Sequence, residues 1–95
     1  MEILKVSSNS NPNKVAGAIA GALSKADKVE MQAIGAGAVN QAVKAIAVAR
    51  RFLNEGGRDI YMVPGFIEAL IDNETRTGMS FRIFVTSQKE PAQME

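Results

Sequence analysis

Four segments of the chain combine apolar, β-branched and aromatic residues in short runs bounded by turn-forming residues, which predicts β-strands. They are residues 2–6, 29–34, 59–63 with an extended continuation at 66–71, and 79–85. Apolar and polar side chains alternate in the second and fourth segments, as expected for strands that bury one face. The third begins as a continuous apolar run, which favours a central position in a sheet. Pro64-Gly65 predicts a bend or bulge within it.

Two segments between these strands repeat apolar residues at helical spacing. The first covers residues 12–26 and begins after Asn11, because Asn is a favoured N-cap and Pro is tolerated at the first helical position. Its far side is unusually small, with Gly17 and Gly21, which indicates a close neighbour on that face. The second helix covers residues 39–54 and ends before a pair of glycines, which are typical after a helix C-terminus.

The resulting order of elements is β-α-β-α-β-β. Two successive β-α-β units and a terminal hairpin predict an α+β fold, a two-layer α/β sandwich in which a mixed four-stranded sheet carries both helices on one face. Residues 1–87 are expected to form a single domain. The polar segment 88–95, which contains Pro91, is expected to be a flexible C-terminal tail.

The chain of 95 residues has no Cys, His or Trp. Without Cys and His, thiol nucleophiles, disulfides and the usual zinc sites are excluded, and the side chain best suited to proton transfer near neutral pH is missing. We therefore expect no catalytic residue, no metal, no cofactor and no small-molecule substrate, and hence a binding protein and not an enzyme. The charged first residues and the lack of a long apolar run indicate neither a signal peptide nor a membrane span, so a cytoplasmic location is expected.

The formal net charge of +1 does not by itself select a partner. Residues 1–50 hold six basic and three acidic groups, a net charge of +3, while residues 51–95 hold five basic and seven acidic groups, a net charge of −2. A protein that packages DNA without selectivity is usually far more basic. Any binding of nucleic acid is therefore expected to be weak or selective.

Amide and cationic side chains gather at the starts of both predicted helices, where free backbone N–H groups favour anions. The candidates are Asn11, Asn13 and Lys14 at the first helix, and Asn40, Gln41 and Lys44 at the second. Such groups hold phosphates or contact bases. The alternatives are capping and loop chemistry at the first helix and an ordinary solvated face at the second. The Gly35–Ala38 junction is interpreted as a tight turn or as a phosphate contact, because it lacks the full motif of a nucleotide-binding loop.

Two further features concern the hairpin and the second helix. Arg76 follows the turn of the predicted hairpin, from which it could reach into a groove of a nucleic acid; the alternative is an ordinary exposed arginine. The second helix carries an extra apolar stripe that includes Val48 and Phe52. A chain of this size buries only roughly 60–65% of the surface that its unfolded form exposes. We therefore expect Val48 and Phe52 to lie between subunits of a homodimer or homotetramer.

Three runs of the sequence strongly resemble the bacterial stage V sporulation protein S family. They are residues 1–7 (MEILKVS), 10–18 (SNPNKVAGA) and 32–50 (QAIGAGAVNQAVKAIAVAR), and the resemblance covers roughly residues 1–87. That family looks like a bacterial branch of the Alba-like fold, whose members bind DNA or RNA as dimers. The resemblance implies contacts from the loop after the first strand, the start of the second helix and the last hairpin. Carried over by position, these are Asn11, Asn13, Lys14, Asn40, Gln41, Lys44 and Arg76.

The sequence also departs from Alba proteins, which typically carry basic residues in the first loop and near the start of the second helix. Here the first loop is rich in Ser and Asn, and the second helix has no cation before Lys44. Two hypotheses follow. One is a small cytoplasmic regulator of sporulation, or of a related developmental programme, that contacts DNA or RNA weakly or selectively. The other is a protein–protein interaction module in such a pathway, without direct contact to nucleic acid.

Overall fold

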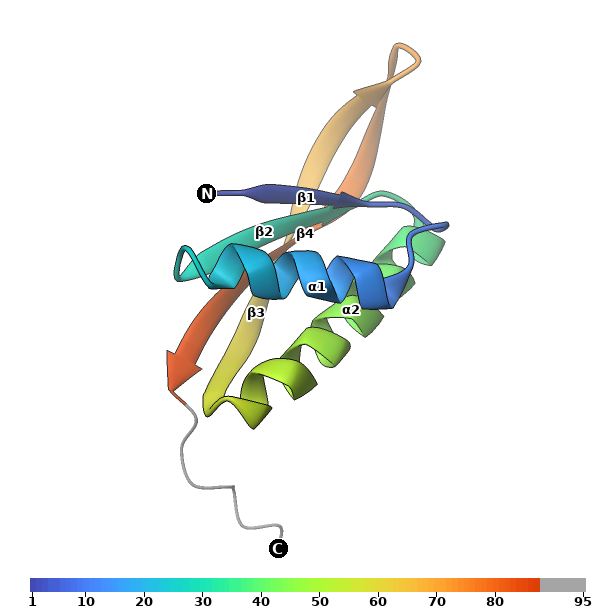
Figure 1. Cartoon of the computed structure of the whole chain (residues 1–95). Helices are drawn as coiled ribbons and strands as arrows, with labels where there is room; N and C mark the ends of the chain where they lie inside the picture. Colours follow the sequence, from blue (N-terminus) through green and yellow to red (C-terminus); the bar gives the residue numbers. More distant parts are fainter. Residues whose placement is uncertain (88–95) are drawn as a thin grey trace, which may run out of the picture.

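The computed structural model describes residues 1–87 and has two layers, with both helices packed on one face of a four-stranded sheet (Figure 1). The elements in chain order are β1 (Ile3–Val6), α1 (Pro12–Leu23), β2 (Lys28–Ala33), α2 (Ala36–Glu55), β3 (Arg58–Ile71) and β4 (Glu74–Ser87). The strand order is β1-β2-β4-β3, in which β1 and β2 are parallel and the other neighbours are antiparallel. The predicted fold class is therefore confirmed. The predicted tail, residues 88–95, lies outside the described residues.

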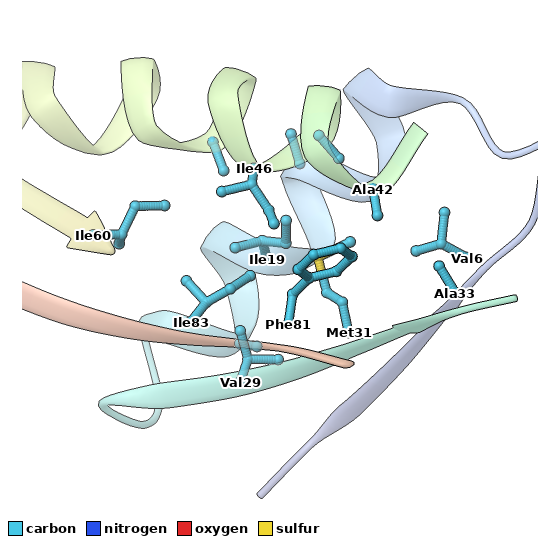
Figure 2. Packing of buried hydrophobic residues seen from close by; sticks show 14 of the residues in the cluster. Val6, Ile19, Val29, Met31, Ala33, Ala42, Ile46, Ile60, Phe81 and Ile83 are labelled. Atoms are coloured by element: carbon cyan, nitrogen blue, oxygen red, sulfur yellow. The ribbon is translucent and has the colours of Figure 1, made fainter. Parts of the chain in front are cut away.

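The hydrophobic core lies between the sheet and the two helices (Figure 2). Ile19 of α1, Met31 of β2 and Ile83 of β4 have no exposed surface. Burial of one such side chain stabilises the fold by roughly 1.5–3 kcal/mol. The side chains that α2 buries are mostly small, which lets this helix lie close to its neighbours. They include Ala38, Ala42, Ala45 and Ala49, each at most 2% exposed.

Strand β3 differs from its prediction in two ways. It lies at the edge of the sheet and not in the centre, because β4 pairs with both β2 and β3. It also continues without a change of register through Pro64, which faces Phe81, and Gly65, which faces Ser80. Proline lacks an N–H donor and is tolerated on an edge strand, where that donor is not needed by a second neighbour. The apolar run of β3 is therefore only partly covered.

The helices also begin and end slightly differently from the predictions. α1 begins at Pro12 as predicted, with Asn11 as its N-cap, but ends at Leu23. α2 begins at Ala36, so most of the Gly35–Ala38 junction is the first turn of a helix whose N-cap, Gly35, has φ 93°. The close neighbour expected at the small face of α1 is absent from the described chain, since a Cβ added at Gly17 or Gly21 would meet nothing within 4 Å.

Beyond the end of β2, the strands β3 and β4 continue as a two-stranded hairpin that projects away from the helices (Figure 1). We call residues 67–78 the arm. Its base requires a glycine, because a Cβ at Gly78 would lie 2.7 Å from the carbonyl oxygen of Ala33 and 2.7 Å from Cγ1 of Ile34. The tight crossing at Gly78 fixes the place where the arm leaves the sheet.

Candidate nucleic-acid interface

The starts of both helices lie at one end of the molecule, because the parallel strands β1 and β2 end at the same edge of the sheet. We call residues 7–14 and 34–41 the rim. Its two parts touch: Nε2 of Gln41 donates a hydrogen bond of 2.8 Å to the carbonyl oxygen of Ser10. A Cβ on Gly37 would lie 3.0 Å from Cβ of Ser8, so the small residue permits this close approach. The fold thus brings together two of the three segments that the sequence singled out.

The loop that precedes α1 is held by its own hydrogen bonds. The Ser7 N–H donates to Oγ of Ser10 at 2.9 Å, and the Asn9 N–H donates to Oγ of Ser7 at 3.2 Å. The loop enters α1 through Asn11, whose Oδ1 accepts from the N–H groups of Asn13 and Lys14. Pairing of these polar groups within the loop favours one backbone shape before any ligand is bound.

The Asn11 cap determines which groups at the start of α1 are available to bind an anion. Pro12 has no N–H, and the N–H groups of Asn13 and Lys14 are already bonded to the Asn11 side chain. The side chains of Asn13 and Lys14 are exposed. The start of α1 therefore presents one amide and one ammonium group, and Asn11 acts mainly as the cap.

The start of α2 is different, since Gly35 provides no side-chain cap. The first intrahelical bond runs from the Val39 N–H to the Gly35 carbonyl oxygen, so the three preceding N–H groups of the helix lack an intrahelical partner. Asn40 and Lys44, one turn apart, are both exposed, and Arg51 continues the same stripe two turns further on. The open helix start and this stripe together form a surface to which a phosphate group is suited.

Gln41 has a different role from its exposed neighbours. It is half-buried, and its amide nitrogen is engaged with Ser10 across 31 positions of the chain. It holds the loop against α2. Gln41 is therefore a positioning residue, whereas the side chains of Asn40 and Lys44 are exposed to solvent.

Charge is unevenly divided between the helices and the arm. The helices α1 and α2 form the helix layer, which carries Lys14, Lys44, Arg50 and Arg51 and a single carboxylate, that of Glu55. The arm carries three carboxylates and one cation, a net charge of −2. They are Glu68, Asp72, Glu74 and Arg76. Arg76 thus lies on the acidic arm, which projects away from the helices (Figure 1).

One cation of the helix layer already has a partner, which the sequence did not reveal. Nε of Arg50 donates to Oδ1 of Asp59 at 2.7 Å, and the Nδ2 of Asn54 donates to the same oxygen at 3.1 Å. These hydrogen bonds, that from Arg50 above all, hold the pKa of Asp59 well below its usual range. The pair joins α2 to the start of β3, so Arg50 is less available to a ligand than Lys44 or Arg51.

The two residues predicted to lie between subunits occupy different environments. Val48 is half-buried and packs against the core of its own chain, whereas Phe52 is 48% exposed near the end of α2. Further exposed apolar side chains lie along β3, whose apolar run predicted a buried strand. They are Tyr61 (53%), Val63 (48%), Phe66 (81%) and Leu70 (71%).

In the part of the chain that the structure describes, no helix has the length and apolarity needed to cross a membrane. Residues 1–87 also contain no group of three or more carboxylates arranged to hold a metal ion.

Comparison with known proteins adds two findings. A family model described as Stage V sporulation protein S (SpoVS) matches residues 2–86 of the chain. Among solved structures, the fold is similar to Alba from Thermoplasma volcanium, with a TM-score of 0.61 and 15% sequence identity; the match covers 90% of this chain and 99% of that chain. At this identity the similarity shows the fold alone.

Proposed function

The chain belongs to the Stage V sporulation protein S family, and on that premise we propose that it is a regulator of sporulation that acts in the cytoplasm by contacting nucleic acid. The observation that carries the proposal is the joining of two helix starts at the rim, beside a helix layer with four cations and one carboxylate. Lys14 and Lys44 neutralise phosphates. Asn13 and Asn40 add hydrogen bonds, while Asn11 and Gln41 hold the rim in shape.

The strength of binding follows from the number of phosphates contacted. Two cations of each protomer, Lys14 and Lys44, give four contacts in a dimer, and the logarithm of the binding constant for duplex DNA then falls with the logarithm of salt with a slope of about −3.6. This is a modest dependence, in keeping with weak or selective binding. Arg76 is not counted, because three carboxylates share the arm with it.

A dimer is the form in which we propose that the protein acts. Phe52 and Val43 are 48% and 42% exposed on α2, and the edge strand β3 beside this helix has no further strand neighbour within residues 1–87. Exposed apolar side chains next to an open strand edge favour association. Val48 of the same helix packs against the core of its own chain and thereby holds the part of α2 that carries this interface. A binding role is also the reason why we propose that the protein is not an enzyme.

The test is a fluorescence anisotropy titration of labelled duplex DNA and labelled single-stranded RNA at two salt concentrations. We expect the combined substitution Lys14→Ala and Lys44→Ala to abolish most of the salt dependence. Lys25→Ala serves as the matched control, because Lys25 is an exposed lysine that follows the other end of α1. Absence of binding to either nucleic acid at low salt would refute the proposal.

The arm favours a second candidate function, which is protein–protein interaction without nucleic acid. Phe66 at its base and Leu70 within it are the most exposed large apolar residues of the described chain, and three carboxylates accompany them. Apolar side chains rimmed by charge are typical of protein-binding surfaces. Affinity capture from a lysate, with and without nuclease, separates the two functions. Partners that resist nuclease but no longer bind the Leu70→Ser variant support the second.

A further inference from the structure

The face of the sheet opposite the helices is uncovered in the described chain, and its side chains form three rows across the strands. Strand register places Lys28, Phe84 and Tyr61 in the first row. The second row holds Ile3, Glu30, Arg82 and Val63. The third holds Lys5, Gln32, Ser80 and Gly65. Their core-facing neighbours, such as Met31 and Ile83, are buried beneath the helices, so these alternate residues point to the open side.

The first row contains the stacked aromatic pair of this sheet face. The rings of Tyr61 and Phe84 are 5.3 Å apart between centroids and inclined by 23°. Phe84 is half-buried, while Tyr61 is 53% exposed on the edge strand. The pair holds the Tyr61 ring in a fixed place and leaves part of it uncovered. A planar ring held in this way is a platform on which a nucleotide base stacks.

A hollow of about 290 Å³ lies beside the second and third rows. Gly65 leaves space there, since a Cβ would meet nothing within 4 Å, and Glu30, Ser80 and Arg82 line the hollow. Glu30 is only 9% exposed; its Oε2 accepts a bond of 2.8 Å from Gln32, and its Oε1 lies 3.9 Å from Nε of Arg82. The volume is at the lower end of the roughly 300–1,000 Å³ that small-ligand pockets occupy. It suits one planar group and not a large ligand.

A second hollow, of about 640 Å³, adjoins the first at Ile67 and continues towards the arm. Lys5 and Gln32 of the third row line one side of it, and Ile67 and Ala69 of the arm line the other. The two hollows therefore form a continuous track from the second row to the arm, and the aromatic pair lies in the next row of the same face.

The charges and spacing of this track fit an extended polynucleotide strand. The three rows carry the cations Lys5, Lys28 and Arg82 and one carboxylate, Glu30. Successive rows are two residues apart along each strand, about 6.6 Å, and this is close to the distance between adjacent phosphates in an extended single strand. Bases within a duplex are stacked on one another and cannot stack on a protein ring, whereas single-stranded bases can.

We propose that the open sheet face binds single-stranded RNA, with one base stacked on Tyr61 and the next in the hollow beside Glu30. A carboxylate accepts hydrogen bonds from an exocyclic amino group, so the hollow selects a base that carries one. Arg82 covers this base, and Lys28 and Lys5 neutralise neighbouring phosphates. RNA is the expected strand because Gln32 and Ser80 supply partners for a 2′-hydroxyl group. The inference rests on the proposed nucleic-acid function but uses a surface other than the rim.

Tyr61 provides its own reporter, because the chain has one Tyr and no Trp. Stacking of a base on this ring quenches tyrosine fluorescence. We expect saturable quenching by single-stranded RNA, weaker quenching by single-stranded DNA of the same sequence and none by a duplex, after correction for absorbance with free tyrosine amide. Equal quenching by RNA and DNA would overturn the assignment to RNA, and absence of quenching by either strand would overturn the site.

Variants separate the sheet face from the rim. Tyr61→Ala should weaken binding of labelled single-stranded RNA about tenfold, while Tyr61→Phe, which keeps the ring, should bind as the unaltered protein does. Gly65→Val should occupy part of the hollow and weaken binding, since a Cβ at this position meets nothing within 4 Å and the added methyl groups extend from it. Circular dichroism confirms that each variant is folded.

Failure of this inference can be distinguished from failure of the proposed function. If Lys14→Ala with Lys44→Ala removes duplex binding while RNA still quenches Tyr61, both surfaces bind independently. If Tyr61→Ala and Gly65→Val leave RNA binding intact, the sheet-face site is refuted even though the rim proposal stands. If these variants instead change the mass of the assembly in light scattering and not the RNA affinity, the open face is a contact between protein chains and the inference is also refuted.

Discussion

The helix layer and the arm have opposite charge although the whole chain has a formal net charge of only +1. The helices α1 and α2 hold four cations and one carboxylate, whereas the arm holds three carboxylates and one cation. The net charge of the chain is therefore close to neutral although two of its surfaces carry opposite charge. The cations of these two regions lie mainly on the helix layer, while Arg76 shares the arm with three carboxylates.

The two regions also differ in what holds them in place. The helix layer packs on a continuous core, which includes Ile19, Leu23 and the alanines of α2. Within residues 1–87 the arm is a two-stranded ribbon with no layer over it, and its Leu70 is 71% exposed. Isolated two-stranded ribbons have little stability of their own. The helix layer thus carries the stability of the fold, while the apolar side chains of the arm remain available to a partner.

The largest effect should come from a substitution beneath the helix layer. Ile19→Ala removes a fully buried side chain and should lower the free energy of unfolding by about 2–5 kcal/mol. Leu70→Ala in the arm should change it by less than about 0.5 kcal/mol. Urea denaturation followed by circular dichroism measures both. A similar loss for the two variants would contradict the division of roles between core and arm.

A smaller effect is expected at the junction of the two regions. Gly78→Ala places a Cβ within 2.7 Å of the Ala33 carbonyl oxygen, which belongs to the backbone and cannot move aside easily. We expect a loss of about 1–3 kcal/mol in unfolding free energy, as for other overpacked sites. Gly17→Ala is the control, because its Cβ meets nothing and alanine favours the helix by roughly 1 kcal/mol. An unchanged stability of the Gly78 variant would mean that the arm leaves the sheet by another path.

Local sequence signals predicted the elements well because each depends on a few neighbouring residues. Asn11 with Pro12 predicted the start of α1, and the alternation in β2 and β4 predicted strands with one buried face. The place of β3 could not be predicted in this way, because strand order depends on pairing between distant segments. Its apolar run indicated a central strand, yet β4 takes that position and leaves Tyr61 and Val63 exposed.

The sequence predicted which segments form the candidate site, but not what each residue does within it. Parallel pairing of β1 and β2 brings the two helix starts together. The engagement of Gln41 with Ser10, and that of Arg50 with Asp59, depends on three-dimensional contacts that no spacing in the sequence reveals. The sequence already shows the carboxylates Glu68, Asp72 and Glu74 near Arg76. Only the structure shows that these residues lie together on an arm that projects from the sheet.

The difference between the helix layer and the arm can be tested by replacing one cation in each region with a neutral residue. Lys44→Ala should reduce the magnitude of the slope of log binding constant against log salt by about 0.9 for each phosphate that the variant no longer neutralises. We expect Arg76→Gln to leave that slope unchanged, because three carboxylates share the arm with Arg76. Anisotropy titrations of duplex DNA at several salt concentrations measure both slopes. Equal reductions would place the arm on the nucleic acid and remove the distinction between the two regions.

The smallest effect concerns Asp59, the carboxylate that touches the helix layer through Arg50 and Asn54. Hydrogen bonds lower its pKa in the folded protein below the value of roughly 3.9 that an unperturbed Asp has. The stabilisation is therefore fully present above about pH 4 and is lost as the pH falls through the folded-state pKa. Asp59→Asn should lower the midpoint of thermal unfolding slightly at neutral pH and reduce its decline in acid.

The same substitution also frees Arg50 on the basic surface, so binding of duplex DNA should become slightly tighter and more dependent on salt. Thermal unfolding followed from pH 2 to 7 checks the first expectation, and anisotropy at low and high salt checks the second. Asp72→Asn is the matched control, since Asp72 is an exposed carboxylate in the turn of the arm. If Asp72→Asn alters DNA binding as much as Asp59→Asn does, the effect comes from the overall charge of the protein. The expectation that the helix layer contacts the phosphate backbone is then contradicted.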